Sequence, residues 1–198
     1  DYIVVKVPRW PFDKFKNADR TLTTALKSTG EVMAIGRCVE EAFKKALRSL
    51  DTDVYKHTNA NEIRMILSRP TDERFPTLFD AFKAGFPLAE IHELTDIAPF
   101  FLEKIKNIVD LEQRLSDSAT KGDIILARKY GFTEPELTAL TGISPADIRE
   151  IAGDPAYKMV DTCAAEFPAT TPYFYSTLDK ECEIPPNDRN KVLILGSG

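Results

Sequence analysis

The stretch "DIAPFFLEKIKNIVDLEQRL", residues 96–115, is the longest part of the sequence with a sustained helical period. Apolar side chains recur in it at spacings of three, four and seven, which places them on one face of a helix: Phe101, Ile105, Ile108 and Leu115. Asp96 is a candidate N-cap, because its carboxylate can accept hydrogen bonds from a first helical turn. The stretch predicts a long amphipathic helix, so other elements have to cover its apolar face.

Shorter segments with the same period lie on both sides of it. They are residues 61–69, 73–86, 88–94, 122–132, 134–140 and 145–153. Thr133 with Glu136 forms a capping-box pattern, and Ser144–Pro145 puts proline at a first helical position. Glycines that suit helix ends stand at the C-terminal ends of three of the segments: Gly85, Gly131 and Gly142. Short helices with short connections predict a compact α bundle.

Phenylalanines gather on these helical faces. One group repeats through residues 75–86, and a second stands at the start of the long helix: Phe75, Phe79, Phe82, Phe86, Phe100 and Phe101. Helical spacing favours a place in the core for all of them. If some of them are exposed, they instead indicate a surface for a partner.

The first 50 residues have a different pattern. Residues 2–8, "YIVVKVP", are apolar and β-branched, which predicts a buried strand closed by the proline. Residues 10–30 keep no period and are expected to be irregular. A helix is predicted over residues 39–50, and its polar face includes Glu40 and Glu41.

After Gly153 the sequence becomes rich in threonine, tyrosine and proline, which favours extended segments and turns. Short strands are predicted near residues 159–162 and 173–177. The last residues, "KVLILGSG" (191–198), predict an apolar strand that runs into a glycine turn. Polar turn formers at residues 50–61 indicate a domain boundary. The predicted fold class is mainly α, a helical bundle with short flanking strands.

Composition limits the classes of function. Hydrophobic residues make up 43% and charged residues 29% of the sequence, as in globular rather than disordered proteins. The net charge of −5 argues against a nucleic-acid surface. No apolar run approaches the roughly 20 residues of a membrane span. Three cysteines without CxxC spacing indicate reduced thiols, as expected in a cytosol.

Two further kinds of site find little support in the sequence. His57 and His92 stand apart from cysteines and carboxylates at ligand spacing, so no metal site is predicted. Residues 122–152 have a helix–turn–helix rhythm, but Arg149 in the last helix has acidic neighbours, whereas a recognition helix needs cations. Nucleic-acid binding is therefore the weakest alternative, behind a stand-alone helical interaction module.

The segment "LKSTGEVMAIGR", residues 26–37, is the main candidate for chemistry. A run of small and polar residues precedes an apolar stretch, namely Lys27, Ser28, Thr29, Gly30 and Glu31. For Glu31 two interpretations stay open. Its carboxylate organises a cation, a lysine or a loop amide, or it caps nearby backbone donors.

Four motifs in this order resemble the large subunits of carbamoyl-phosphate synthases. They are "VPRWPFDKF" (7–15), "LTTALKSTGEVMAIGR" (22–37), "VDTCAAEFPATTPYFYSTLDKECE" (160–183) and "VLILGSG" (192–198). The resemblance implies an ATP-dependent ligase of pyrimidine and arginine biosynthesis with two ATP-grasp halves. The first half phosphorylates bicarbonate, ammonia converts the carboxyphosphate to carbamate, and the second half phosphorylates the carbamate.

The resemblance also implies a division of the chain. Residues 1–50 would close the first ATP-grasp half, residues 51–189 would form a helical oligomerisation domain, and residues 190–198 would begin the second half. The chain is thus expected to be a middle part of a longer cytoplasmic protein. Alone it is expected to act as a scaffold and self-association surface, with no catalytic, cofactor-binding or metal-binding residue of its own.

For the whole enzyme, the resemblance implies ATP and Mg²⁺ as cofactors, with K⁺ as a further candidate. It implies the rest of the large subunit and a glutaminase, separate or fused, as partners, and neither nucleic acid nor a membrane. Residues 27–31 would line the floor of the first active site or its ammonia passage. A loop of small residues suits that place, because little side chain keeps the backbone from a phosphate or a reactive intermediate.

Overall fold

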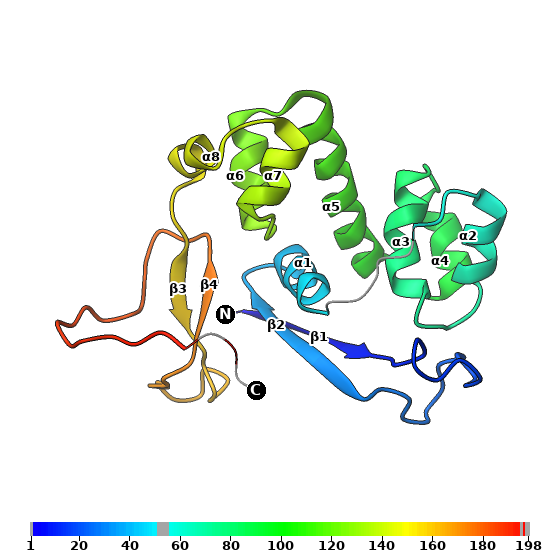
Figure 1. Ribbon diagram of the computed structural model, residues 1–198, viewed down its shortest axis with the longest axis horizontal. Helices are drawn as coiled ribbons and strands as arrows, with labels where there is room; N and C mark the ends of the chain where they lie inside the picture. The colour runs from blue at the N-terminus through cyan, green and yellow to red at the C-terminus, as the bar shows by residue number, and fades with distance from the viewer. Residues whose placement is uncertain (1, 51–55, 195, 197–198) are drawn as a thin grey trace. The chain divides into compact units, whose positions relative to one another are not determined.

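The long helix predicted from the sequence is present as α5 (Pro99–Ser118), beside which the other helices of the bundle lie (Figure 1). A computed structural model describes residues 2–50, 56–194 and 196. The chain divides into two compact units, residues 1–154 and residues 155–198. Eight helices and two two-stranded sheets form from the described residues, so the mainly α fold class is confirmed.

The first unit combines a β-hairpin with all of these helices. Its elements are β1 (Ile3–Arg9), β2 (Gly30–Gly36), α1 (Val39–Ser49), α2 (Ala60–Leu67), α3 (Arg74–Lys83), α4 (Leu88–Thr95), α5, α6 (Lys121–Lys129), α7 (Glu134–Thr141) and α8 (Pro145–Ala152). The domain boundary predicted near residue 50 stays a prediction, since residues 51–55 lie outside the described residues.

Two hydrophobic clusters cover α5 along its length. The first joins its N-terminal half, through Leu102 and Ile105, to apolar side chains of α2, α3 and α4. The second joins its C-terminal half, through Leu111 and Leu115, to side chains of α6, α7 and α8. Phe43 of α1 packs against both clusters. Because each short helix is too short to be stable alone, its burial against α5 fixes the bundle.

Several predicted helix ends are confirmed. The Thr133 hydroxyl accepts from the Glu136 amide while the Glu136 carboxylate accepts from the Thr133 amide, which completes the capping box of α7. Ser144 caps α8, with Pro145 at its first position. The glycines predicted to follow three helices have positive φ angles: Gly85, Gly131 and Gly142.

The start of α5 differs from the prediction. Asp96 is not its N-cap: it ends α4 in the left-handed conformation, and its amide donates to the His92 carbonyl at 2.8 Å. The helix begins at Pro99, whose fixed φ suits a first position. The buried place before Ile105 belongs to Leu102 rather than to Phe101, which is 47% exposed.

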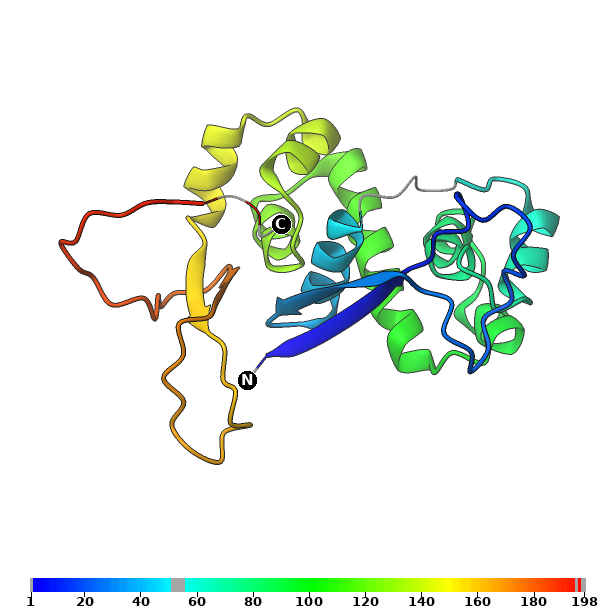
Figure 2. The same ribbon diagram turned by 60° about the horizontal axis from the view of Figure 1, so that its bottom comes forward.

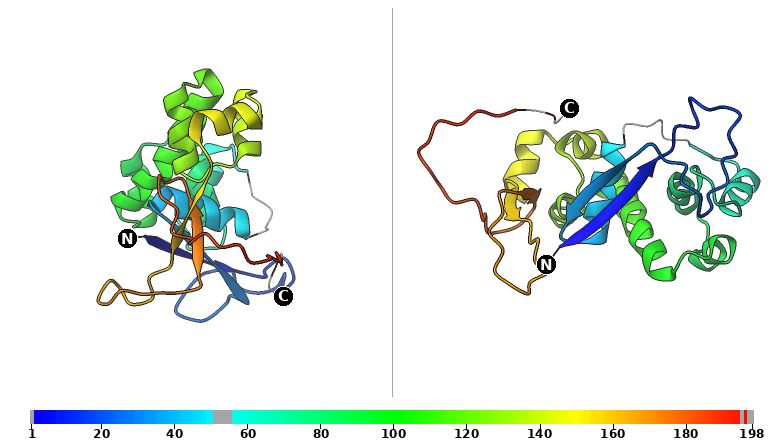
Figure 3. Two further views of the ribbon diagram at one scale, coloured as in Figure 1. Left: turned by 90° about the vertical axis from the view of Figure 1, so that its left-hand side faces the viewer. Right: turned by 90° about the horizontal axis from the view of Figure 1, so that it is seen from below.

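The strand predicted at the N-terminus exists but is not buried. β1 pairs with β2 in antiparallel register from Ile3↔Gly36 to Arg9↔Gly30, and the hairpin lies against α1 (Figure 3). A two-stranded sheet with a helix on one face leaves its other face open, so Val4 is 45% exposed. The connection over residues 10–29 contains neither helix nor strand, as expected.

The second unit is built on an antiparallel pair of β3 (Ala156–Met159) and β4 (Phe174–Thr177). β4 lies where a strand was predicted, whereas β3 begins three residues earlier than the predicted strand at 159–162. Lys158 is 7% exposed, and its ammonium lies 3.4 Å from a Glu183 carboxylate oxygen. That glutamate also accepts from the Met159 amide at 2.6 Å, so it fastens the following segment to β3.

The strand predicted at the C-terminus is wrong for the residues that the structure describes there. Residues 191–194 have no strand conformation, and Val192 is 89% exposed. A strand needs a neighbour for its backbone hydrogen bonds, and neither described sheet pairs with this segment. An apolar, β-branched sequence alone does not supply that neighbour. Residues 195, 197 and 198 lie outside the described residues.

The direction in which α5 turns its apolar side chains can be tested by paired truncation. Ile105→Ala is expected to lower the free energy of unfolding by about 2–5 kcal/mol, because the 1%-exposed side chain would leave a cavity. Phe101→Ala is expected to cost about 1 kcal/mol or less, because its ring is half exposed. Urea unfolding followed by circular dichroism measures both. Equal losses would contradict the observed orientation of α5, in which Ile105 is buried and Phe101 is half exposed.

Candidate functional site

The residues predicted to carry chemistry lie at the end of the β1–β2 connection and the start of β2. Lys27, Ser28 and Thr29 precede the strand, whereas Gly30 and Glu31 are its first two residues. The structure therefore divides the predicted loop between an irregular segment and a strand. The Thr29 amide donates to the Arg9 carbonyl at 3.1 Å, which extends the pairing of the hairpin by one hydrogen bond.

The Lys27 ammonium is engaged by its own segment. It donates to the Thr21 carbonyl at 2.6 Å, to the Asp19 carbonyl at 2.9 Å and to the Asp19 carboxylate at 3.0 Å. An ammonium has three protons to donate, and three acceptors are present. The ammonium thus closes residues 19–27 into a ring, and in this arrangement its hydrogen bonds hold the loop itself.

Asp19 responds to the same contacts. A hydrogen bond from the Thr21 amide, at 2.9 Å, and the bond from Lys27 lower the pKa of its carboxyl to about 2. Both donors favour the ionised form of the carboxylate. The carboxyl group is therefore ionised throughout the neutral range, which keeps the Lys27 contact charge-assisted.

Glu31 and Gly30 face a more open environment. The Glu31 carboxylate lies 2.6 Å from the Lys6 ammonium across the hairpin, and both side chains are more than half exposed. Of the two interpretations of Glu31, the structure favours the one in which the carboxylate organises a lysine. A Cβ atom added to Gly30 would meet nothing within 4 Å. The space beside this glycine is therefore open in the chain.

The second glycine of the segment has a packing role. A Cβ atom at Gly36 would lie 2.9 Å from the Ala42 amide nitrogen and 3.0 Å from Glu41 side-chain atoms. Only glycine leaves room for the strand to pass the first turn of α1 at this distance. The apolar stretch between the two glycines thus runs along the helix, and Gly36 lets the strand pass close to the α1 backbone.

Two carboxylates near this contact, Glu40 and Glu41, belong to the polar face of the helix predicted from the sequence. That assignment is wrong: Glu40 and Glu41 are each 2% exposed. A Glu41 oxygen accepts from the Arg37 amide at 2.6 Å, and the other lies 2.7 Å from the Lys45 ammonium. Lys45 in turn donates to the Ile35 carbonyl at 2.8 Å. Glu41 therefore joins the end of β2 to α1.

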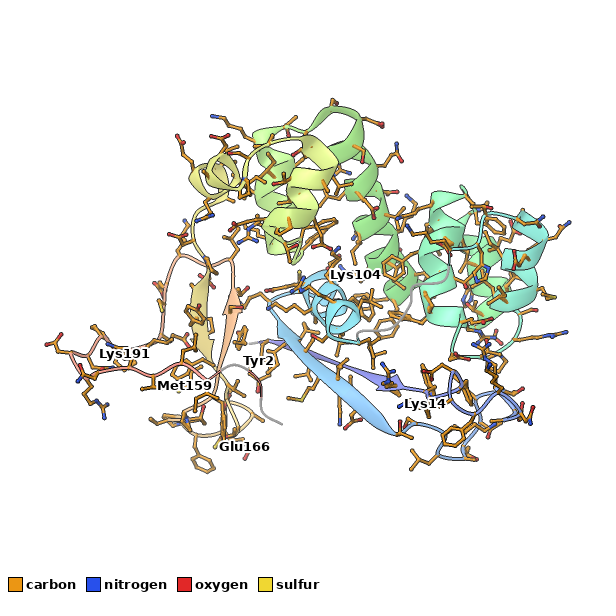
Figure 4. The ribbon with its side chains drawn as sticks, viewed as in Figure 1. Tyr2, Lys14, Lys104, Met159, Glu166 and Lys191 are labelled. Carbon is orange, nitrogen blue, oxygen red and sulfur yellow. The ribbon has the colours of Figure 1, made fainter. Side chains whose placement is uncertain are left out.

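Glu40 points to the opposite side and joins α1 to α5. Its carboxylate accepts from the Asn107 amide group at 2.9 Å and lies 3.4 Å from the Lys104 ammonium. Figure 4 labels Lys104 where α5 passes α1. The helical period predicts that Glu40 and Glu41 face solvent. It cannot indicate that the hairpin and α5 cover α1 from two sides. The spacing of Glu41 and Lys45, four residues apart on one helix, was the available signal for a local network.

The buried carboxylates also affect Cys38, whose thiol is half-buried beside them. Burial raises the pKa of this thiol to about 11, and the negative charges of Glu40 and Glu41 add to the effect. A hydrogen bond involving the Glu41 backbone acts in the opposite direction without reversing it. The thiol is therefore protonated at neutral pH, which makes it a poor nucleophile or metal ligand.

Other kinds of site can be assessed over the same residues. In the part of the chain that the structure describes, no group of three or more histidine, cysteine or acidic side chains is arranged to hold a metal ion. Arg149, the cation of the helix–turn–helix segment, lies 3.0 Å from a Glu134 carboxylate oxygen. Among the described helices, none is long and apolar enough to cross a membrane. All three cysteines are free thiols.

Comparison of the sequence with known proteins identifies a family. The sequence pattern of the family described as "Carbamoyl-phosphate synthetase large chain, oligomerisation domain" matches residues 31–155, more than half of the chain. The chain belongs to this family. The match begins within β2 and ends where the first compact unit ends, so it takes in the Gly36 contact, the buried carboxylates and the whole bundle.

Three relatives extend the similarity of this family member to the full chain. It is 66% identical over 198 residues to the carbamoyl phosphate synthase large chain of Methanocorpusculum labreanum. It is 68% identical to the protein of that name from Methanoculleus marisnigri and 69% identical to that from Methanoregula boonei. All of this chain is covered, but only 19% of each relative. The chain therefore spans about a fifth of the length of the relatives that it matches.

The buried network of α1 predicts a strong effect of Glu41→Ala. The substitution is expected to lower the free energy of unfolding by about 2–4 kcal/mol, because it removes the acceptor of the Arg37 amide and the carboxylate that pairs with the largely buried Lys45 ammonium. Glu112→Ala is the matched control. Its partner Lys83 is half exposed, so the expected loss is below about 1 kcal/mol. Thermal unfolding monitored at 222 nm compares the two, and similar losses would argue against a buried role for Glu41.

The raised pKa of Cys38 predicts slow thiol chemistry. In a variant whose other cysteines are serines, alkylation at pH 8 is expected to be on the order of 100-fold slower than alkylation of Cys182 in the corresponding single-cysteine variant. Cys182 is exposed, whereas Cys38 forms its reactive thiolate only as the pH rises toward about 11. Iodoacetamide labelling followed by mass spectrometry gives both rates. A Cys38 rate that levels off by pH 9 would refute the assignment.

Proposed function

We propose that the chain is the central linking part of a carbamoyl-phosphate synthase large chain. That protein is an ATP-dependent ligase that makes carbamoyl phosphate from bicarbonate, ammonia released from glutamine, and two ATP. The observation that carries the proposal is identity of 66–69% over the whole chain to relatives that bear this name. Participation in pyrimidine and arginine biosynthesis in the cytoplasm belongs to the same proposal.

Within that protein, the helical unit acts as a scaffold and as a self-association surface. The family description names an oligomerisation domain, and a scaffold needs elements whose separation is fixed. The 20-residue α5 meets this requirement, because clusters on both halves of it hold the remaining helices. The hairpin and α1 are tied to the same helix through Glu40.

The surface that supports self-association lies at the N-terminal end of α5. Phe100 and Phe101 are 53% and 47% exposed, and their rings contact each other edge to face with centroids 5.2 Å apart. Lys104 lies over the Phe100 ring at 5.4 Å. Two adjacent exposed aromatic rings beside a cation form the kind of anchor on which protein interfaces depend. A second copy of the chain is the occupant that fits the family description.

ATP, Mg²⁺ and the alternative K⁺ are assigned to the whole enzyme rather than to this segment. Phosphoryl transfer needs metal ions and several cations around the phosphates. Lys27 and Glu31, the two ends of the candidate loop, already have partners. Lys27 donates to Asp19 and Thr21, and Glu31 pairs with Lys6. Residues 27–31 are retained as the lining of the first active site or its ammonia passage, with the catalytic charges supplied by other parts of the protein.

Self-association is tested by removing the aromatic pair. The double variant Phe100→Ser, Phe101→Ser is expected to weaken association at least about tenfold, because interface energy concentrates on a few aromatic anchors. Sedimentation velocity over a range of concentrations measures it. Phe167→Ser, at a 69%-exposed ring in the second unit, is the control and is expected to leave association unchanged. An unchanged double variant would reject this surface, and a wild-type monomer at high concentration would reject self-association of the chain.

Two experiments test where nucleotide binds and what residues 27–31 do. Saturable binding of Mg-ATP by the isolated chain would contradict the assignment of nucleotide to the rest of the enzyme. In the full-length enzyme, a Thr29→Val, Glu31→Gln variant with unchanged bicarbonate-dependent ATP hydrolysis would contradict a place for residues 27–31 in the first active site.

A further inference from the structure

The irregular connection between β1 and β2 is fastened to the helical bundle at one side chain. The Arg20 guanidinium donates to both carboxylate oxygens of Asp72, at 2.9 and 2.6 Å, and lies 2.9 Å from a Glu73 oxygen. Both acidic residues stand directly before α3. Figure 2 shows the connection running beside α2, α3 and α4. Residues more than 50 positions apart are thereby held together.

The geometry of this contact is that of a specific attachment. A planar guanidinium that bonds both oxygens of one carboxylate fixes orientation as well as distance. Asp72 is 13% exposed and Glu73 22% exposed, so solvent screens the contact less than it screens a surface pair. A backbone bond supports it, since the Leu22 amide donates to the Pro70 carbonyl at 2.6 Å. Residues 20–22 are thus fixed to the turn between α2 and α3.

The neighbours of Arg20 in the chain hold Lys27. Asp19 and Thr21 supply all three acceptors that bind its ammonium. One short segment therefore has two sides: the guanidinium contacts the bundle, and the flanking residues contact the first residue of the candidate loop. The connection has no helix or strand of its own to define the position of these acceptors. Their position depends on what holds Arg20.

We propose that Arg20 is a positioning residue through which the helical bundle sets the place of Lys27 and hence of residues 27–31. Asp72 and Glu73 hold Arg20, Arg20 holds the backbone of Asp19 and Thr21, and these hold the Lys27 ammonium. Displacement of α3 against the hairpin would be transmitted to the start of β2 by the same contacts. The inference does not require self-association, and it stands whether or not nucleotide binds near the loop.

The proposal predicts that Arg20→Met exposes Lys27. Acetylation of Lys27 by acetic anhydride is expected to rise about three- to tenfold relative to acetylation of the exposed Lys121, because the amine loses the fixed acceptors that cover it. Mass spectrometry of the folded chain gives both rates in one sample. Arg20→Lys keeps the charge but not the two-pronged geometry, so its expected rate lies between those of the wild type and Arg20→Met.

Two further variants keep the test decisive. Asp72→Asn weakens the contact from the other side and is expected to raise the Lys27 rate in the same direction, even if Arg20→Met fails to fold. Arg114→Met removes a comparable pair with Asp123 elsewhere and is expected to leave the ratio unchanged. An unchanged Lys27 ratio in both Arg20→Met and Asp72→Asn would overturn the proposal. An equal rise in Arg114→Met would also overturn it, since the effect would then reflect general loosening of the chain.

Discussion

The burial of one face of α5 is the constraint on which the first unit depends. Six of its side chains are at most 5% exposed, and they belong to two separate clusters that meet along the helix. The short helices contribute few buried residues each, and α7 and α8 bury only Leu137 and Ile148. Such helices are stable only against a partner. The length of α5 therefore decides how far apart the two groups of short helices, α2–α4 and α6–α8, are held.

Charged groups add to apolar packing in connecting the hairpin to this framework. Glu40 and Glu41 are adjacent in α1 but point to different partners, one on α5 and one at the end of β2. A buried carboxylate is tolerated only when donors surround it, so each of them specifies its neighbours more narrowly than an apolar side chain would. The hairpin contributes few fully buried residues. The hydrogen bonds of Glu41 and Lys45 with residues 35–37 therefore help to hold it against α1.

Periodicity predicted the helices well and the environment of particular residues less well. Ile63, Ile66 and Leu67 are buried as their spacing indicates, because neighbours cover α2 from one side. Glu40 and Glu41 escaped prediction because α1 is approached from two sides. Phe101 was mispredicted because the first turn of α5 is covered at Leu102 and not at Phe101. For the candidate loop, sequence indicated the residues but not their acceptors, since the bond from Lys27 to Thr21 and the attachment of Arg20 to Asp72 depend on how an irregular segment folds back.

The engaged charges of the loop restrict what residues 27–31 can contribute to chemistry. A lysine that donates to three acceptors and a glutamate that faces a lysine already have their partners. A negative ligand could recruit Lys27 only by replacing at least one of the acceptors that Asp19 and Thr21 supply. Open space beside Gly30 is then what the loop offers most readily. Of the two places proposed for residues 27–31, such a loop therefore suits the ammonia passage better than a phosphate-binding floor, because a wall that guides a small neutral molecule needs no free charge.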